Sequence, residues 1–111
     1  MITENNIYTE QFKFKNRDGT EGIIEIRPLA GKHLPKLYAV VGKLREAKGS
    51  NAEVSLAALD ENTMETLVQL CTVTIKRSFP SESDDKIDEF VSSHFLKLMT
   101  AIMSVNFRTG E

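Results

Sequence analysis

The sequence predicts a mainly helical α+β fold, in which an N-terminal β-hairpin is followed by three to four packed α-helices. Two observations lead to this prediction. Apolar and polar residues alternate with a period of two only within residues 12–27, as in half-buried strands. From residue 34 onward, apolar residues recur at helical spacing. The 111 residues suit one domain. We expect it to span residues 11–107, between a flexible N-terminus (1–10) and a polar tail (108–111).

The hairpin is predicted from two short alternating segments, residues 12–15 and 24–27. Residues 16–20 between them contain an Asp-Gly step, which favours the positive φ of a tight turn. An isolated hairpin is marginal in water, so its apolar face must cover the helices, and its free edges could accept another strand. The predicted apolar face consists of Phe12, Phe14, Ile24 and Ile26.

The first helix is expected to begin near Gly31, with Pro35 in its first turn, and to end near Gly49. Residues 49–59 are small and polar with weak periodicity, which is typical of a mobile connection. The predicted inner face of this helix consists of Leu34, Leu37, Tyr38, Val41 and Leu44.

The second helix has either Asp60 or Asn62 as its N-cap, and with Asn62 the side chain of Glu65 would complete a capping box. Lys76 and Arg77 fall in its last turn, where cations complement the helix dipole, and Pro80 prevents its continuation. Its apolar face, wide enough for burial on more than one side, consists of Met64, Leu67, Val68, Cys71 and Ile75, widened by Leu70 and Val73.

A short helix follows, capped by Ser81 or Ser83, and Ser92-Ser93 offers a cap for the final helix. The inner face of the short helix consists of Ile87, Phe90 and Val91. The apolar face of the final helix consists of Phe95, Leu98, Met99, Ile102 and Val105, with Leu96 and Met103 to the side and Phe107 at the end.

Composition argues against several classes of function. The net charge of −2 provides no basic excess for nucleic acid. One cysteine cannot form an intrachain disulfide, which fits a reducing compartment. The N-terminus has no features of a secretory signal, and no apolar run reaches the length of a membrane span. We therefore expect a cytoplasmic protein that binds neither nucleic acid nor membrane.

Catalytic and metal-binding patterns are missing from the sequence. His33 and His94 are far apart, and no spacing typical of zinc ligands occurs. Cys71 lies on an apolar helix face, as a buried hydrophobic residue does. Asp84 and Asp85 fit the first turn of a capped helix better than a metal site. We expect no catalytic residue, no metal and no cofactor, and hence a protein that is not an enzyme.

The order of elements and several short motifs resemble the tail assembly chaperones of long-tailed, siphovirus-like bacteriophages and prophages. The resemblance covers roughly residues 12–107. Its motifs are packing and turn sequences: Arg27-Pro28-Leu29, Lys32-His33-Leu34-Pro35, Lys76-Arg77-Ser78-Phe79-Pro80, and Glu89-Phe90-Val91 with the step to Phe95.

The resemblance implies a chaperone in the bacterial cytoplasm that binds the tape measure protein, assists assembly of the tail tube and is absent from the mature virion. The tail tube protein is a second implied partner, and the hairpin edge offers a route to self-association. The final helix has more apolar positions than one buried face requires, so it is the predicted partner-binding surface. Its residues are Leu96, Met99, Met103 and Phe107.

Two alternatives remain open from the sequence. The first is another small phage structural or adaptor protein that stays in the particle. The second is a small nucleic-acid-binding regulator, which would need a basic recognition helix. In the most basic helix, residues 32–48, lysine and arginine are scattered rather than clustered.

Overall fold

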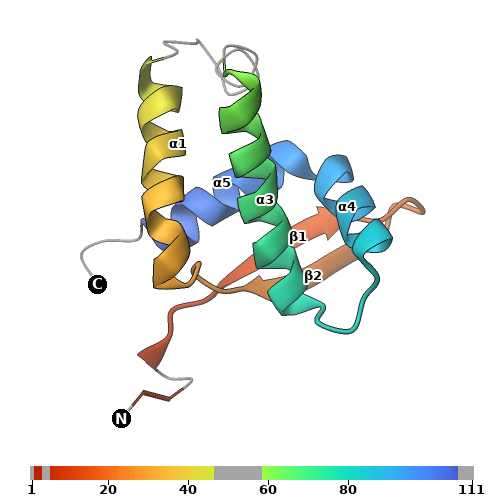
Figure 1. Ribbon diagram of the computed structural model, residues 1–111. Helices are drawn as coiled ribbons and strands as arrows, with labels where there is room; N and C mark the ends of the chain where they lie inside the picture. Colours follow the sequence, from red (N-terminus) through yellow and green to blue (C-terminus); the bar gives the residue numbers. More distant parts are fainter. Residues whose placement is uncertain (1, 4–5, 47–58, 108–111) are drawn as a thin grey trace.

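The computed structural model describes residues 2–3, 6–46 and 59–107 (Figure 1). A two-stranded antiparallel sheet is followed by four α-helices in this part of the chain, which confirms the predicted fold class. The predicted helix end at Gly49, nearly all of the 49–59 connection and the 108–111 tail lie outside the described residues. The elements are β1 (Glu10–Lys15), β2 (Glu21–Ile26), a 3-10 turn η2 (Gly31–His33), α1 (Leu34–Glu46), α3 (Glu61–Ser78), α4 (Asp84–Ser93) and α5 (Phe95–Asn106).

The hairpin forms with the predicted turn and the predicted inner face. Gly19 has a φ of 89°, and Asp18 Oδ1 accepts a hydrogen bond of 3.0 Å from the Thr20 backbone N–H. Hydrogen bonds from Thr20 favour the charged carboxylate and lower the pKa of Asp18. On the inner face, Phe12 and Ile26 are buried and Phe14 and Ile24 are half-buried against the core, so the prediction is confirmed.

Phe14 lies over Gly22, its partner in the register of the two strands. A Cβ added to Gly22 would lie 2.4 Å from Cζ of Phe14, so the ring occupies the space that any larger residue would need. The Phe14 ring also packs edge-on against Phe90 of α4, with ring centroids 5.0 Å apart. The His94 ring lies 4.7 Å from that of Phe90, so His94 packs within the same group of rings. This aromatic cluster joins the hairpin to α4 and α5.

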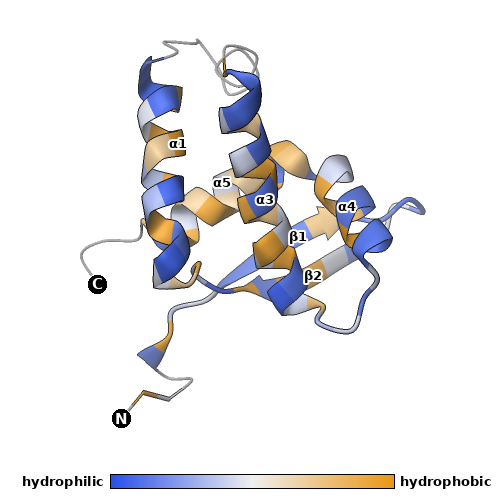
Figure 2. Ribbon diagram, in the orientation of Figure 1, coloured by the Kyte–Doolittle hydropathy of each residue, from blue (hydrophilic) through white to orange (hydrophobic). Residues whose placement is uncertain are grey.

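The central helix is α3, which contacts α1, α4, α5 and β2 (Figure 1). Five of its residues are buried, including Thr74, whose hydroxyl donates to the Leu70 carbonyl within the helix at 2.9 Å. Orange segments of α3 and α5 meet where these helices cross (Figure 2). The buried core consists of Phe12, Ile26, Leu29, Leu37, Val40, Leu67, Leu70, Cys71, Ile75, Ile87, Val91, Leu98, Met99, Ile102 and Val105.

The inner face of α1 agrees with the predicted one except at Tyr38, since Leu34 and Leu44 also pack against the core. Leu37 and Val40 are its buried residues, whereas Tyr38, predicted to face inward, is 58% exposed. Among the helices, α1 packs mainly against α3, so only a narrow stripe of its surface is covered. The Tyr38 ring instead lies against that of Phe107, with ring centroids 5.3 Å apart.

The structure decides between the alternative helix caps. Asp60 is the N-cap of α3 and accepts from the Thr63 N–H at 2.7 Å, so the capping box of Asn62 and Glu65 does not form. Ser83 caps α4. The predicted Ser92-Ser93 cap is wrong, because α4 continues through both serines and His94 begins α5 without a side-chain cap.

Side-chain hydrogen bonds connect the end of β2 and the loop after it to α3 and α5. Arg77 Nη1 donates to the Pro28 carbonyl at 2.6 Å, and Ser78 Oγ donates to the Glu25 carbonyl at 2.8 Å. Asn106 Oδ1 accepts from the Leu29 N–H at 2.8 Å. The motifs at residues 27–29 and 76–80 therefore meet in space, and Arg77 does more than complement the helix dipole.

Candidate functional site

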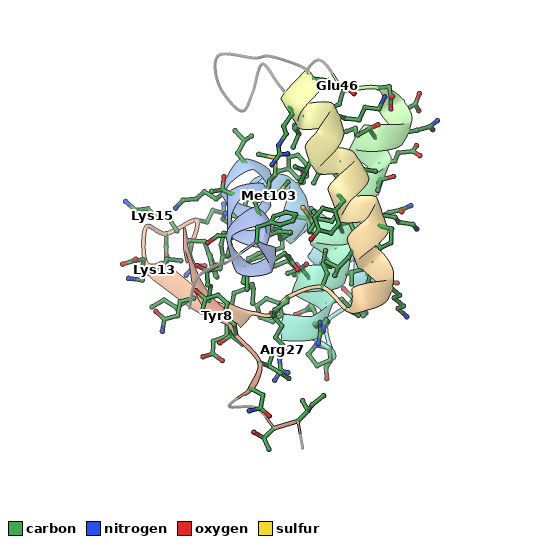
Figure 3. All side chains as sticks on the ribbon, turned by 90° about the vertical axis from the view of Figure 1, so that its left-hand side faces the viewer. Tyr8, Lys13, Lys15, Arg27, Glu46 and Met103 are labelled. Atoms are coloured by element: carbon green, nitrogen blue, oxygen red, sulfur yellow. The ribbon has the colours of Figure 1, made fainter. Side chains whose placement is uncertain are left out.

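The four residues predicted to bind a partner do not form one exposed surface. Met99 is only 7% exposed and belongs to the core, because α5 is covered by α3, α4 and β1 along that face. Met103 (labelled in Figure 3) and Phe107 are half-buried and pack against the core. Leu96 is 37% exposed, but it lines a groove between β1 and α5, whereas the Phe107 ring contacts Tyr38 of α1.

A more apolar surface lies over α3, which stands between α1 and α4 (Figure 1). Its first part is a groove of about 580 Å³ between α3, α4 and the start of α5. Val68, an exposed side chain of α3, lies in this groove and is 39% exposed. The residues lining it are Met64, Val68, Asp88, Val91, Ser92 and Phe95.

The second part of this surface is a groove of about 450 Å³ that reaches toward the start of α1. It shares Val68 and Asp88 with the first, so the two depressions adjoin, and together they are called here the α3 groove. Val73 adds apolar surface, and His33 and Lys36 supply a polar rim. The wide apolar face predicted for residues 64–75 is the sequence signal for this groove, although the sequence prediction placed the partner surface on the final helix.

Cys71 is fully buried in the described structure. Burial disfavours the thiolate and raises the pKa of the Cys71 thiol to about 12, from an ordinary value of 9.0. A thiol with this pKa is overwhelmingly protonated at neutral pH and is a poor nucleophile. The cysteine therefore acts as a small core residue, as the sequence predicted.

The burial of Cys71 leads to a prediction about its reactivity. A thiol-specific reagent near neutral pH should label Cys71 at least about a hundredfold more slowly in the native chain than in denaturant, because labelling requires opening of the core. Above about pH 9 the unfolded thiol ionises and the folded one does not, so stability should fall as pH rises from 9.0 toward 12. Labelling at equal rates with and without denaturant would contradict the buried position.

Within the described residues, no group of three or more His, Cys, Asp or Glu side chains could hold a metal ion. His94 belongs to the aromatic cluster, and His33 lies at the rim of the α3 groove. No helix in residues 6–46 or 59–107 has both the length and the apolar sequence needed to cross a bilayer.

Comparison with protein-family models, curated proteins and solved structures found no match. The resemblance to phage tail assembly chaperones therefore stays a prediction.

Proposed function

We propose that this chain is a non-enzymatic chaperone that holds an apolar helical segment of a longer partner in the α3 groove. The observation that carries the proposal is the pair of adjoining apolar depressions over α3, both of which Val68 lines. Following the family resemblance, the partner is the tape measure protein of a long-tailed phage or prophage. Binding would shield its apolar surface until the tail tube assembles around it.

The shape of the α3 groove favours a helix as its occupant. Met64, Val68 and Thr72 are spaced four residues apart on α3 and line the groove, and α3 contacts α1 and α4. A row with this spacing accepts the side-chain ridge of a second helix. Met64 adds a flexible thioether, which adapts to partner side chains of different shape.

The rim of the groove would orient the occupant. Asp88 borders both parts of the depression, and Lys36 borders the part near α1. An amphipathic helix with apolar residues toward Val68 and polar residues toward these charges would satisfy both regions. Exposed apolar area of this kind, with a polar rim, is typical of interaction sites.

The proposal predicts that Val68→Asp weakens binding to the tape measure protein at least about tenfold, because a carboxylate would be desolvated in the apolar floor. Binding of purified helical fragments of that protein can be measured by calorimetry. Ile23→Asp is the control, since Ile23 is also an exposed apolar side chain (54% exposed, against 39% for Val68) but lines neither the α3 groove nor the groove beside β1. Circular dichroism and thermal unfolding would show that both variants fold.

Two outcomes would contradict this assignment of the surface. Unchanged binding by a folded Val68→Asp variant would exclude the α3 groove. Loss of binding in Met103→Asp or Phe107→Asp, with Val68→Asp unaffected, would move the site to the end of α5 as the sequence predicted.

Simple measurements distinguish the proposed chaperone from the two alternative functions, a phage adaptor protein and a nucleic-acid-binding regulator. Mass spectrometry of purified virions should not detect a chaperone, whereas an adaptor that stays in the particle would be present. A nucleic-acid-binding regulator would shift DNA or RNA in a gel, with a shift that weakens as salt is raised.

A further inference from the structure

The outer edge of β1 has backbone groups that the hairpin itself does not use. Asn16 N–H donates to the Thr20 carbonyl at 2.8 Å, which makes this a hydrogen-bonded pair. Such pairs alternate along an antiparallel ladder, so Phe14, Phe12 and Glu10 bond toward β2. The N–H and C=O groups of Gln11 and Lys13 then point away from β2. In the described part of the chain, no other hydrogen bond reaches them.

The opposite edge of the sheet is already occupied at one end. By the same alternation, the Glu25 carbonyl points outward from β2, and it accepts the hydrogen bond from Ser78 Oγ of α3. Arg77 covers the Pro28 carbonyl just beyond that strand. The last turn of α3 therefore closes the β2 edge where the strand ends, and β1 offers the more accessible edge.

The β1 edge borders a groove of about 480 Å³ between that strand and α5, called here the β1 groove. The apolar part of its α5 wall comes from Leu96 and Ala101. Its complete lining is Glu10, Gln11, Phe12, Lys13, Leu96, Lys97, Thr100, Ala101 and Ser104. An extended segment placed here would pair with β1 on one side and contact α5 with every second side chain.

The charges beside the β1 groove are mainly positive. Lys13 and Lys97 line it, and Lys15 lies further along the exposed face of β1, opposite Glu21 of β2. In Figure 3, Lys13 and Lys15 extend from the hairpin on the side of the molecule opposite α1. Glu10 is the acidic residue of the lining, and its Oε1 accepts a hydrogen bond of 2.9 Å from Ser104 Oγ of α5. The positive row disfavours pairing with a second copy of β1, because like charges on adjacent strands repel.

From these observations we infer that the β1 edge binds an extended segment of a partner protein in which acidic and apolar residues alternate. The acidic side chains lie beside Lys13 and Lys15 on the exposed face of the sheet, and the apolar side chains lie on Leu96 and Ala101. Backbone hydrogen bonds to Gln11 and Lys13 fix the register. This site is separate from the α3 groove, so it does not depend on the proposed helical partner.

A peptide titration tests the site on the full chain. The probe is a synthetic peptide of about eight residues that alternates glutamate and valine, and the comparison peptide alternates lysine and valine. Amide NMR signals of the labelled protein should shift at Gln11 and Lys13 with the glutamate peptide, and the lysine peptide should bind at least about fivefold more weakly.

Two variants separate backbone pairing from charge. Lys13→Pro removes an outward N–H without removing a β1–β2 hydrogen bond. The variant should therefore fold but no longer bind the peptide. Lys13→Glu keeps the backbone and should weaken binding at least about fivefold, whereas the matched charge reversal Lys86→Glu on α4 should not. If Lys13→Pro does not fold, Lys13→Glu still decides the question.

The inference would be overturned by equal binding of the two peptides, by shifts confined to other surfaces, or by no binding at about 1 mM peptide. Concentration-dependent dimerisation that Lys13→Pro removes would also overturn it, by assigning the edge to a second copy. None of these results depends on the Val68→Asp experiment, so the two proposals can fail separately.

Discussion

Replacing Gly22 with valine should destabilise the fold by about 1–3 kcal/mol, because the new side chain would overpack the inner face of the hairpin. The Phe14 ring fills the position of a Cβ at residue 22, with a separation of only 2.4 Å. To make room, that ring must leave its contacts with Phe90 and His94, which join the hairpin to the helices. Chemical denaturation monitored by circular dichroism would measure the change.

A second glycine provides the control for this experiment. Gly42 lies within α1, and a Cβ there would meet nothing within 4 Å. Gly42→Ala should therefore stabilise the chain by up to about 1 kcal/mol through helix propensity, whereas Gly22→Ala should destabilise it. In a Phe14→Ala background, Gly22→Val should cost much less than in the wild-type chain, because the clash is gone. Shifts of the same sign for both alanine variants would refute this explanation.

Asn106→Ala should also destabilise the fold by about 1–3 kcal/mol, because it leaves a buried backbone donor without an acceptor. Asn106 Oδ1 accepts from the N–H of Leu29, a residue that is 5% exposed and 77 positions earlier in the chain. Its Nδ2 also donates to the Ile102 carbonyl at 2.8 Å. One side chain thus ties the end of α5 to the loop after β2.

Thr100→Ala is the matched control for Asn106→Ala on the same helix. Thr100 also makes a side-chain hydrogen bond, to the Leu96 carbonyl at 3.1 Å, but it is exposed. Water can replace that bond, so the free energy of unfolding should change by no more than about 0.5 kcal/mol. Hydrogen exchange at the Leu29 amide should become faster in Asn106→Ala but not in Thr100→Ala. Equal effects of the two variants would show that Leu29 does not need this acceptor.

The predictable part of the fold is the part that depends on local chemistry. The inner face of the hairpin followed from alternation, and Gly19 followed from the turn sequence. Tyr38 was misplaced because helical spacing identifies an apolar stripe but not how many neighbours cover it, and α1 packs mainly on one helix. Asp60 and Asn62 were both chemically suitable N-caps. The structure distinguishes them because α3 begins directly after Asp60.

The candidate site was harder to predict for the same reason. Sequence periodicity showed that the faces containing Val68 and Met99 were both broad. It could not show that α5 would be covered along Met99 while α3 would keep Val68 at the surface. That difference depends on how the helices pack on one another, as in the contacts of α5 with α3, α4 and β1, which join residues far apart in the sequence.

The hydrogen bond from Ser78 to Glu25 has a consequence for the size of any assembly built through the sheet. A fibre that grows by β-strand pairing requires two sheet edges on every subunit that are free to pair. Because Ser78 occupies the outward carbonyl of Glu25, the end of β2 lacks an acceptor that an added strand would need, and β2 offers a shorter edge than β1. Complexes formed through this sheet should therefore add their strand at β1 rather than at β2, which limits growth at the second side.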